Sequence, residues 1–110
     1  MSLREPFFTF TTKDDELMIQ YAASHALWKR TLGAKLNYKE AGLVICSHII
    51  ERAREGRSVK EIIDSARKLL KPADVMFGVP EIMNKIVVNV RFRNGKIRRI
   101  IVDNPIRGEG

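Results

Sequence analysis

The side chains that could do chemistry are few in this sequence: two histidines, His25 and His48, and one cysteine, Cys46. A catalytic metal centre needs several His, Cys or carboxylate ligands that converge on one ion. Cys46 and His48 lie two residues apart in a segment with a helical pattern, so they point to different sides of the helix. His25 lies in another predicted helix without a ligand beside it. These residues favour packing or surface roles, and we predict no catalytic residue and no metal site in this chain.

Two other kinds of site are also disfavoured. A lone free cysteine is usually a small buried hydrophobe rather than a nucleophile. The acidic run Asp14, Asp15 and Glu16 begins a predicted helix, where carboxylates complement the helix dipole. There is no Gly-rich loop of the kind that holds phosphates. We therefore expect no cofactor in this chain.

The first element that would position these residues is a helix that begins at Thr12 and ends at Gly33. Thr12 is a capping hydroxyl with an acid three residues later, and Gly33 is a typical helix stop. Between them, residues recur at helical spacing: Leu17, Met18, Tyr21, Ala22, Ser24, Trp28 and Leu32.

The second helix is predicted to begin after Asn37. The Asn37 side chain would accept a hydrogen bond from the backbone N–H of Glu40, and the Glu40 side chain would accept one from the backbone N–H of Asn37. It ends at Gly56. The third helix begins at Ser58 with Glu61 as its partner in a capping box. Its predicted buried stripe extends to a stop at Pro72: Val59, Ile62, Ile63, Ala66, Leu69 and Leu70.

A short turn that contains Gly78 then leads to Pro80, which suits the first position of a last small helix. Beyond it the pattern changes to a period of two, typical of a strand. Val88, Val90 and Phe92 share one face, and the residues between them are polar or basic. This part of the chain is predicted to be a β-hairpin.

The hairpin turn is predicted at Asn94-Gly95, a pair that favours a two-residue type I′ turn, with the return strand at 96–103. That register would set Arg91 against Arg98, and it would place Arg99 on the apolar face and Ile100 on the polar face. One extra residue between Gly95 and Ile100, as a bulge or a longer loop, would restore the alternation. We predict such an irregularity.

The expected fold is one α+β domain, a bundle of three to four helices followed by a C-terminal antiparallel β-hairpin. The length of 110 residues suits a single domain, which we place at 12–106. Residues 1–11 are interpreted as an N-terminal leader, with 1–3 as candidate expression remnants, and residues 107–110 as a tail. No apolar run approaches the length of about 18 residues that a membrane span requires. The first residues lack a signal-peptide pattern, and one cysteine fits the reducing cytoplasm, where we expect the protein.

The net charge of +7 favours an anionic partner, either nucleic acid or an acidic protein surface. The basic excess is concentrated in the hairpin, whose arginines include Arg91, Arg93, Arg98 and Arg99. Helices followed by a basic hairpin also describe a winged-helix nucleic-acid-binding module. The third helix, which would enter the groove, carries a mixture of acidic and basic residues, so nucleic acid is the less favoured partner.

Three separated motifs resemble the gamma subunit of urease: GAKLNYKEA at 33–41, ERAREGRSV at 51–59 and DVMFGVPEI at 74–82. The ending Asn104-Pro105-Ile106 is also similar, and the resemblance covers essentially the whole chain. Most residues that carry it have a role in starting or stopping helices. We interpret the following as the fold-specifying motif: Gly33, Asn37, Tyr38, Glu40, Gly56, Ser58, Gly78 and Pro80.

The resemblance implies a non-catalytic structural subunit of urease, the enzyme complex that hydrolyses urea to ammonia and carbamate. It implies urease alpha and beta subunits as partners in an (alpha-beta-gamma)3 assembly. The nickel ions, their histidines and a carbamylated lysine would belong to the alpha chain. Exposed apolar and edge surfaces tend to be covered by partners, which gives these candidate subunit contacts: Phe7, Phe8, Phe10, Arg91, Arg98 and Arg99.

The sequence also departs from the family pattern. Lys39 stands where the family usually has proline, and Asp103 stands where it usually has histidine. The return strand is one residue longer than usual, and Trp28 is an unusual residue at its position. These departures leave a diverged stand-alone paralogue as an alternative, beside the nucleic-acid-binding module.

Overall fold

The computed structural model describes residues 12–106 and has four α-helices followed by a two-stranded antiparallel sheet. The α+β fold with a C-terminal hairpin is therefore as predicted. The elements, in chain order, are α1 (Lys13–Thr31), α2 (Tyr38–Arg54), α3 (Val59–Ala66), the 3-10 turn η1 (Pro72–Asp74), α4 (Val79–Ile82), β1 (Lys85–Arg91) and β2 (Ile97–Asp103).

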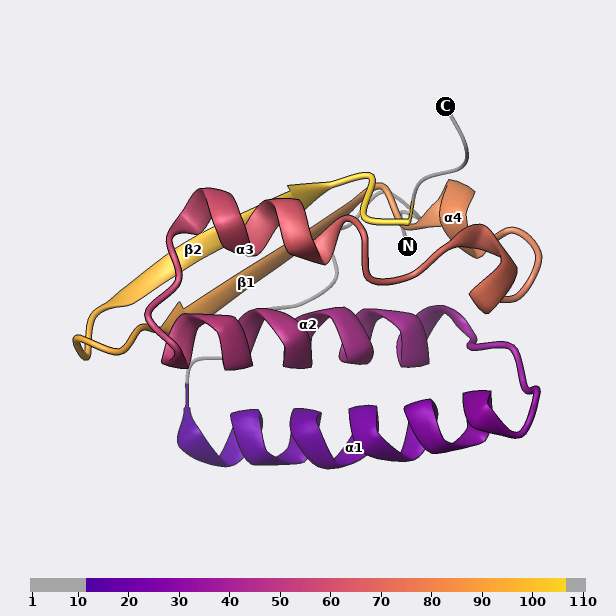
Figure 1. The fold of residues 1–110 in the computed structure, drawn as a ribbon, viewed down its shortest axis with the longest axis horizontal. Coiled ribbons are helices and arrows are strands. Elements are labelled where there is room, and N and C mark those ends of the chain that lie inside the picture. The colour runs from indigo at the N-terminus through magenta and orange to yellow at the C-terminus, as the bar shows by residue number, and fades with distance from the viewer. Residues whose placement is uncertain (1–11, 107–110) are drawn as a thin grey trace.

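The helices are arranged in layers around α2 (Figure 1). On one side, α2 packs along α1, which forms the outer layer of the molecule. On its other side α2 packs against β1 and α3, and α3 in turn contacts β2. Because α2 lies in the middle, it has more buried residues than any other helix of residues 12–106, nine along its length.

Local sequence signals account for the helix starts. The Thr12 hydroxyl accepts a hydrogen bond from the backbone N–H of Asp15 at 3.1 Å. Complete capping boxes are present where they were predicted, between Asn37 and Glu40 and between Ser58 and Glu61. Each box satisfies two backbone N–H groups that a helix start would leave without partners.

Two helix boundaries differ from the predictions. The last regular residue of α3 is Ala66, several residues before Pro72, because the chain continues in turns closed by bonds such as Lys68 N–H to the Ser65 carbonyl. Leu70 is nevertheless buried beyond the helix end. Pro80 occupies the second position of α4 rather than the first, since Val79 opens that helix after Gly78.

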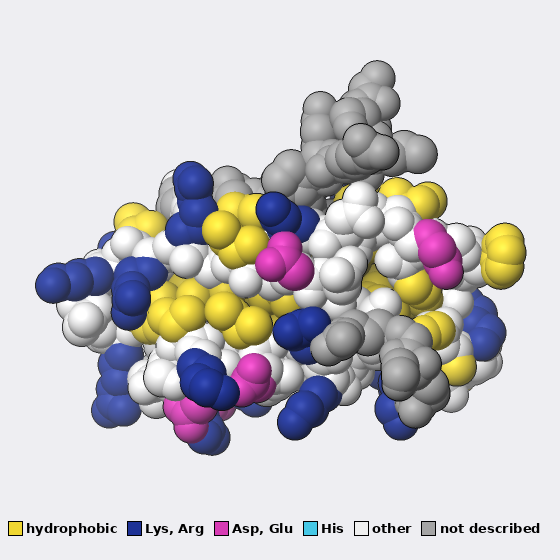
Figure 2. Space-filling model, turned by 90° about the horizontal axis from the view of Figure 1, so that it is seen from above, with side chains coloured by type: hydrophobic (Ala, Val, Ile, Leu, Met, Phe, Trp, Pro, Cys, Tyr) yellow, Lys and Arg dark blue, Asp and Glu magenta, His cyan; other side chains and the backbone are white. Residues whose placement is uncertain are grey.

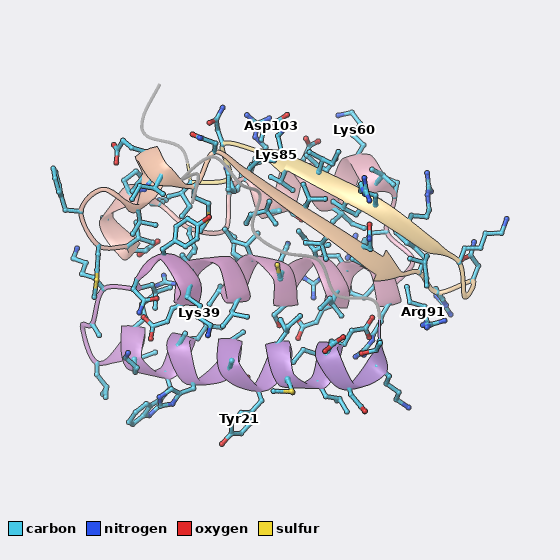
Figure 3. The ribbon with its side chains drawn as sticks, turned by 180° about the vertical axis from the view of Figure 1, so that it is seen from behind. Tyr21, Lys39, Lys60, Lys85, Arg91 and Asp103 are labelled. Atoms are coloured by element: carbon cyan, nitrogen blue, oxygen red, sulfur yellow. The ribbon has the colours of Figure 1, made fainter. Side chains whose placement is uncertain are left out.

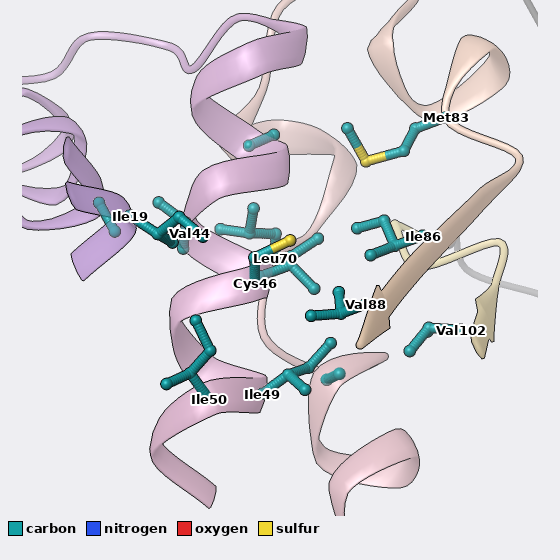
Figure 4. Close-up of a cluster of buried hydrophobic side chains, with 14 of the residues drawn as sticks. Ile19, Val44, Cys46, Ile49, Ile50, Leu70, Met83, Ile86, Val88 and Val102 are labelled. Carbon is teal, nitrogen blue, oxygen red and sulfur yellow. The ribbon is translucent and has the colours of Figure 1, made fainter. Parts of the chain in front are cut away.

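The hydrophobic core lies between α2, α3 and the inner face of the sheet (Figure 4). Ile45 and Ile49 of α2 are completely buried, as are Val88 and Ile100 of the two strands. Leu36 and Val75 extend this core past the helices, through a parallel β-bridge between their two loops. Core residues thus come from every element named above except η1.

The helix α1 forms where its apolar spacing indicated, but most of the residues that provided that signal lie on its exposed side. Its buried residues are Glu16, Ile19, Ala23 and Ala26. Tyr21, in contrast, points away from α2 (Figure 3). Apolar residues therefore occupy two opposite faces of α1, and the face towards the core has Ile19 and two alanines.

The hairpin has a longer turn than the predicted two-residue type I′ turn. Phe92 N–H donates to the Lys96 carbonyl, and Gly95 N–H donates to the Phe92 carbonyl, both at 2.8 Å. The loop therefore has three residues, 93–95, and Gly95 adopts a φ of +87°, the left-handed region that favours glycine. The extra residue lies in this loop and not after Gly95, because β2 pairs with β1 without interruption from Ile97.

The longer loop sets the register of the sheet. Val88 lies opposite Ile100, so both face the core as the alternation requires. The pair of Arg91 and Arg98 that a two-residue turn would form is absent, since Arg91 lies opposite Ile97 and Arg98 lies opposite Val90. The like-charge repulsion expected between these two arginines across the strands is thereby avoided.

Candidate functional site

His48 forms a structural hydrogen bond inside the helical layer. Its Nε2 lies 2.8 Å from Oγ of Ser65 on α3. The Ser65 hydroxyl donates its single proton to the Ile62 carbonyl at 3.1 Å, so His48 Nε2–H acts as the donor to Ser65. Burial, followed by the nearby charge of Arg52, lowers the pKa of His48 below its usual value. Both features favour a neutral imidazole that links α2 to α3.

Cys46 lies in the core, close to Val88 and Leu70 (Figure 4). Its side chain is fully buried, and burial raises the pKa of the thiol to about 12. A thiolate is the nucleophilic form of cysteine. Cys46 therefore has the environment of a packing residue and not that of a nucleophile.

His25 lies on the exposed side of α1, on a different helix from His48. Its ring stacks on the Trp28 indole, with ring centroids 5.9 Å apart and an interplanar angle of 24°.

Within residues 12–106, no three His, Cys, Asp or Glu side chains come together in a way that could hold a metal ion. Over the same residues, no helix is both long and apolar enough to cross a membrane.

The fold-specifying residues at the α1–α2 turn hold several segments together. Gly33 follows α1 with a φ of +92°, and Leu36 pairs with Val75 a few residues later. Lys29 Nζ lies 2.6 Å from Glu40 Oε2, which ties the end of α1 to the start of α2. Tyr38 opens α2 there, and burial raises its pKa.

The predicted contact arginines lie on the hairpin in different settings. Arg99 Nε donates to Asn89 Oδ1 across the strands at 3.2 Å, on the outer face of the sheet. The Arg98 guanidinium lies over the Phe92 ring, 5.5 Å from the ring centroid. Arg91 lies near the turn end of the sheet (Figure 3). Among residues 12–106, the salt bridges involve none of these three arginines.

A basic surface surrounds this turn. The Arg93 side chain lies against Gly56, where a Cβ would approach Arg93 Cδ to 3.4 Å, so the turn sits beside the α2–α3 connection. Figure 2 shows Lys and Arg side chains gathered at this end of the molecule, which is on the left in Figures 1 and 2. At the opposite end of the sheet, Lys85 pairs with Asp103 at 3.9 Å. Within the hairpin, the basic side chains without an acidic partner among residues 12–106 therefore lie towards the turn.

The candidate contact residues Phe7, Phe8 and Phe10 lie outside the residues that the structure describes. Their role stays a prediction. The hairpin arginines are exposed and available for contact, but the structure does not bring them to a cavity or to a nucleophile.

Sequence reasoning missed one buried ionic contact. Glu16 is 4% exposed, and its Oε1 lies 2.8 Å from Arg54 Nη2 at the end of α2. Helical spacing alone could have suggested it, because Glu16, Ile19 and Ala23 fall on one side of α1. The reasoning instead assigned Glu16 only to the helix dipole.

A family model described as "Urease, gamma subunit" matches residues 8–106. The match covers nearly the whole sequence, including all the motifs at 33–41, 51–59 and 74–82. The chain therefore belongs to the urease gamma-subunit family.

Proposed function

We propose that this chain is a non-catalytic structural subunit that helps to assemble a urease in the cytoplasm. Its partners are a large alpha chain and a beta chain, in an (alpha-beta-gamma)3 complex that hydrolyses urea to ammonia and carbamate. Nickel and its ligands belong to the alpha chain. The observation that carries the proposal is the family match over residues 8–106.

The placement of the potential ligands supports a non-catalytic role. His25 and His48 lie on separate helices, the first exposed on the outer side of α1 and the second bonded to Ser65. The only cysteine, Cys46, is buried in the core. A dinuclear nickel site would need more ligands than these, and it would need them on one side of a cleft.

The basic turn of the hairpin supports contact with an acidic partner surface. Arg91, Arg98 and Arg99 project from a small rigid sheet and have no acidic partner among residues 12–106. Arginine is well suited to bind carboxylates in pairs of parallel hydrogen bonds. We place the contact with the other urease chains here, together with the leader residues Phe7, Phe8 and Phe10.

A nucleic-acid-binding module is the competing function. A winged helix would present α3 to the groove and the hairpin to the phosphates. Here α3 exposes Glu61 and Asp64, and Lys60 is paired with Asp64 at 3.2 Å. An acidic helix of eight residues is a poor reader of a negatively charged groove.

Co-expression with a urease alpha chain and beta chain tests the proposal. We expect one complex that contains all three chains, holds nickel and releases ammonia from urea. This chain alone should neither hold nickel nor release ammonia. A variant with Arg91→Glu, Arg98→Glu and Arg99→Glu should lose co-purification, and Lys60→Glu on α3 should retain it. Nickel binding and urea hydrolysis by the purified chain alone would contradict the proposal. Binding to DNA or RNA that falls steeply with salt would favour the competing function.

A further inference from the structure

The exposed side of α1 carries a continuous apolar face. Five large side chains on it are 54% to 81% exposed. At 3.6 residues per turn they fall, with His25, within about 100° of the helix circumference. They are Leu17, Met18, Tyr21, Trp28 and Leu32, and together with His25 we call them the α1 stripe. Soluble monomers rarely expose so large a contiguous apolar area without a binding role.

The spacing of the α1 stripe is symmetric. Leu17 and Tyr21 are four residues apart, as are Trp28 and Leu32. The outer pair, Leu17 and Leu32, and the inner pair, Tyr21 and Trp28, have the same midpoint, which lies between Ser24 and His25. Two such helices can therefore pack antiparallel around that midpoint. Tyr21 of one copy then meets Trp28 of the other, and Leu17 meets Leu32. A two-fold axis makes each of these contacts twice.

The two ends of α1 bear on the orientation through the helix dipole. The basic residues of its last turn, Lys29 and Arg30, are already paired with Glu40 and Asp74 of the same chain, so their charges are largely compensated there. An antiparallel pair opposes the two helix dipoles, whereas a parallel pair aligns them. The dipoles therefore favour the antiparallel arrangement.

The exposed area is close to what a dimer requires. If a large side chain offers roughly 200 Å² when fully exposed, the exposures of 54% to 81% over five side chains give on the order of 600 Å² per copy. A standard stable interface buries about 800 Å² per partner. The α1 stripe thus fits a reversible dimer whose formation depends on concentration.

We propose that the α1 stripe is a self-association surface, on which a second copy of this chain docks antiparallel about a two-fold axis beside His25. This inference goes beyond the assembly proposed with the urease chains, because it requires this chain alone. The hairpin turn, which we assign to those chains, stays free in the dimer, since α2 separates it from the outer side of α1 (Figure 1).

Sedimentation of the full chain over a concentration series tests the inference. We expect the weight-average mass to rise from the monomer value of 12.6 kDa towards twice that value. Tyr21→Glu with Trp28→Glu should weaken the association at least about ten-fold, which corresponds to 1.4 kcal/mol. Phe77→Glu is the matched control, because it also replaces an exposed aromatic residue but lies between η1 and α4. Unchanged helix content would show that the double variant folds.

Cross-linking tests the antiparallel geometry separately. His25→Cys places a thiol next to the proposed axis, so a short bis-maleimide should join two copies efficiently. Lys60→Cys on α3 is the control and should remain largely monomeric. The native thiol of Cys46 is buried and should not interfere.

Three results would overturn the inference. The first is a monomer at every concentration, and the second is equal cross-linking of both cysteine variants. The third is a double variant that dimerises like the unmodified chain. If the double variant instead loses only co-purification with the urease alpha chain, the α1 stripe belongs to that chain and self-association is wrong. The hairpin variants would still test the proposed function independently.

Discussion

Glu16 of α1 and Arg54 of α2 form an ion pair in which one partner is buried and the other reaches solvent. Glu16 Oε1 lies 2.8 Å from Arg54 Nη2, while the side chains are 6% and 46% exposed. The second carboxylate oxygen of Glu16 has no hydrogen-bond partner among residues 12–106. Arg54 is therefore the group that compensates for the burial of this carboxylate.

Removal of Arg54 should destabilise the protein. Arg54→Ala leaves the Glu16 carboxylate buried without its hydrogen-bonded partner, and we expect a loss of about 2 kcal/mol in the free energy of unfolding. Arg57→Ala is the control, since Arg57 pairs with Glu55 on the exposed surface and should cost less than about 0.5 kcal/mol. Urea denaturation monitored by circular dichroism measures both changes. Equal stability of the two variants would show that the Glu16 pair contributes nothing.

The Glu40 carboxylate should contribute stability that disappears in acid. The backbone N–H of Asn37 and then the Lys29 ammonium lower the pKa of Glu40. A lowered folded pKa stabilises the fold above the unfolded pKa, and this contribution is lost as the pH falls through the folded pKa. Glu40→Gln should therefore be less stable than the parent by up to about 1 kcal/mol at pH 7. The difference should vanish well below pH 4, as measured by denaturation at both pH values.

His48 should produce a pH dependence of stability in a different range. Burial, and next the charge of Arg52, lower the pKa of His48, while Glu55 acts in the opposite direction. The unfolded chain therefore binds a proton first as the pH falls, below about 6.5. Stability should decrease from that pH down to the folded pKa and then level off. His48→Gln keeps a donor for Ser65 but cannot be protonated, so its stability should change less between pH 7 and pH 5.

Helix starts could be predicted from the sequence because capping is a local interaction. Asn37 reaches the N–H of Glu40 within a single turn, whatever the rest of the chain does. The end of α3 was less predictable, since Leu70 remains buried after the helix has changed into turns. The apolar residues keep their spacing where the helix changes into turns. The sequence pattern therefore does not indicate where the helical hydrogen bonds end.

The orientation of α1 could not be predicted from its pattern. Large apolar residues such as Tyr21 and Trp28 gave the helical period, but the side with Ala23 and Ala26 faces α2. Small residues allow close approach of two helices, and a sequence pattern with two apolar faces does not say which one is inside. For the candidate site, the sequence placed the arginines on the hairpin and indicated one extra residue there. The predicted position of that residue, after Gly95, is wrong, because the residue lies in the three-residue loop 93–95.

The Cys46 thiol should be unreactive in the folded protein. Burial raises its pKa to about 12, so very little thiolate exists at pH 8, and the side chain has no exposed surface. We expect negligible reaction with a disulfide reagent such as dithionitrobenzoate until urea unfolds the chain. Lys60→Cys provides an exposed thiol as the control, and it should react at once. A native Cys46 that reacts at the rate of the control would contradict the placement of this residue in the core.

The three-residue turn of the hairpin should depend on Gly95. Gly95 has a φ of +87°, which residues with a Cβ adopt only with strain, and its N–H closes the turn on the Phe92 carbonyl. Gly95→Ala should therefore cost about 1 kcal/mol in the free energy of unfolding. Lys96→Ala, the next residue along, has no such constraint and should cost much less.

A two-residue type I′ turn would require a left-handed conformation at Asn94 as well, so Asn94→Gly would then stabilise the hairpin. In the observed loop Asn94 has a negative φ and its side chain accepts from Lys96 N–H, so Asn94→Gly should instead destabilise it. The sign of that change, measured by thermal unfolding, separates the two turns.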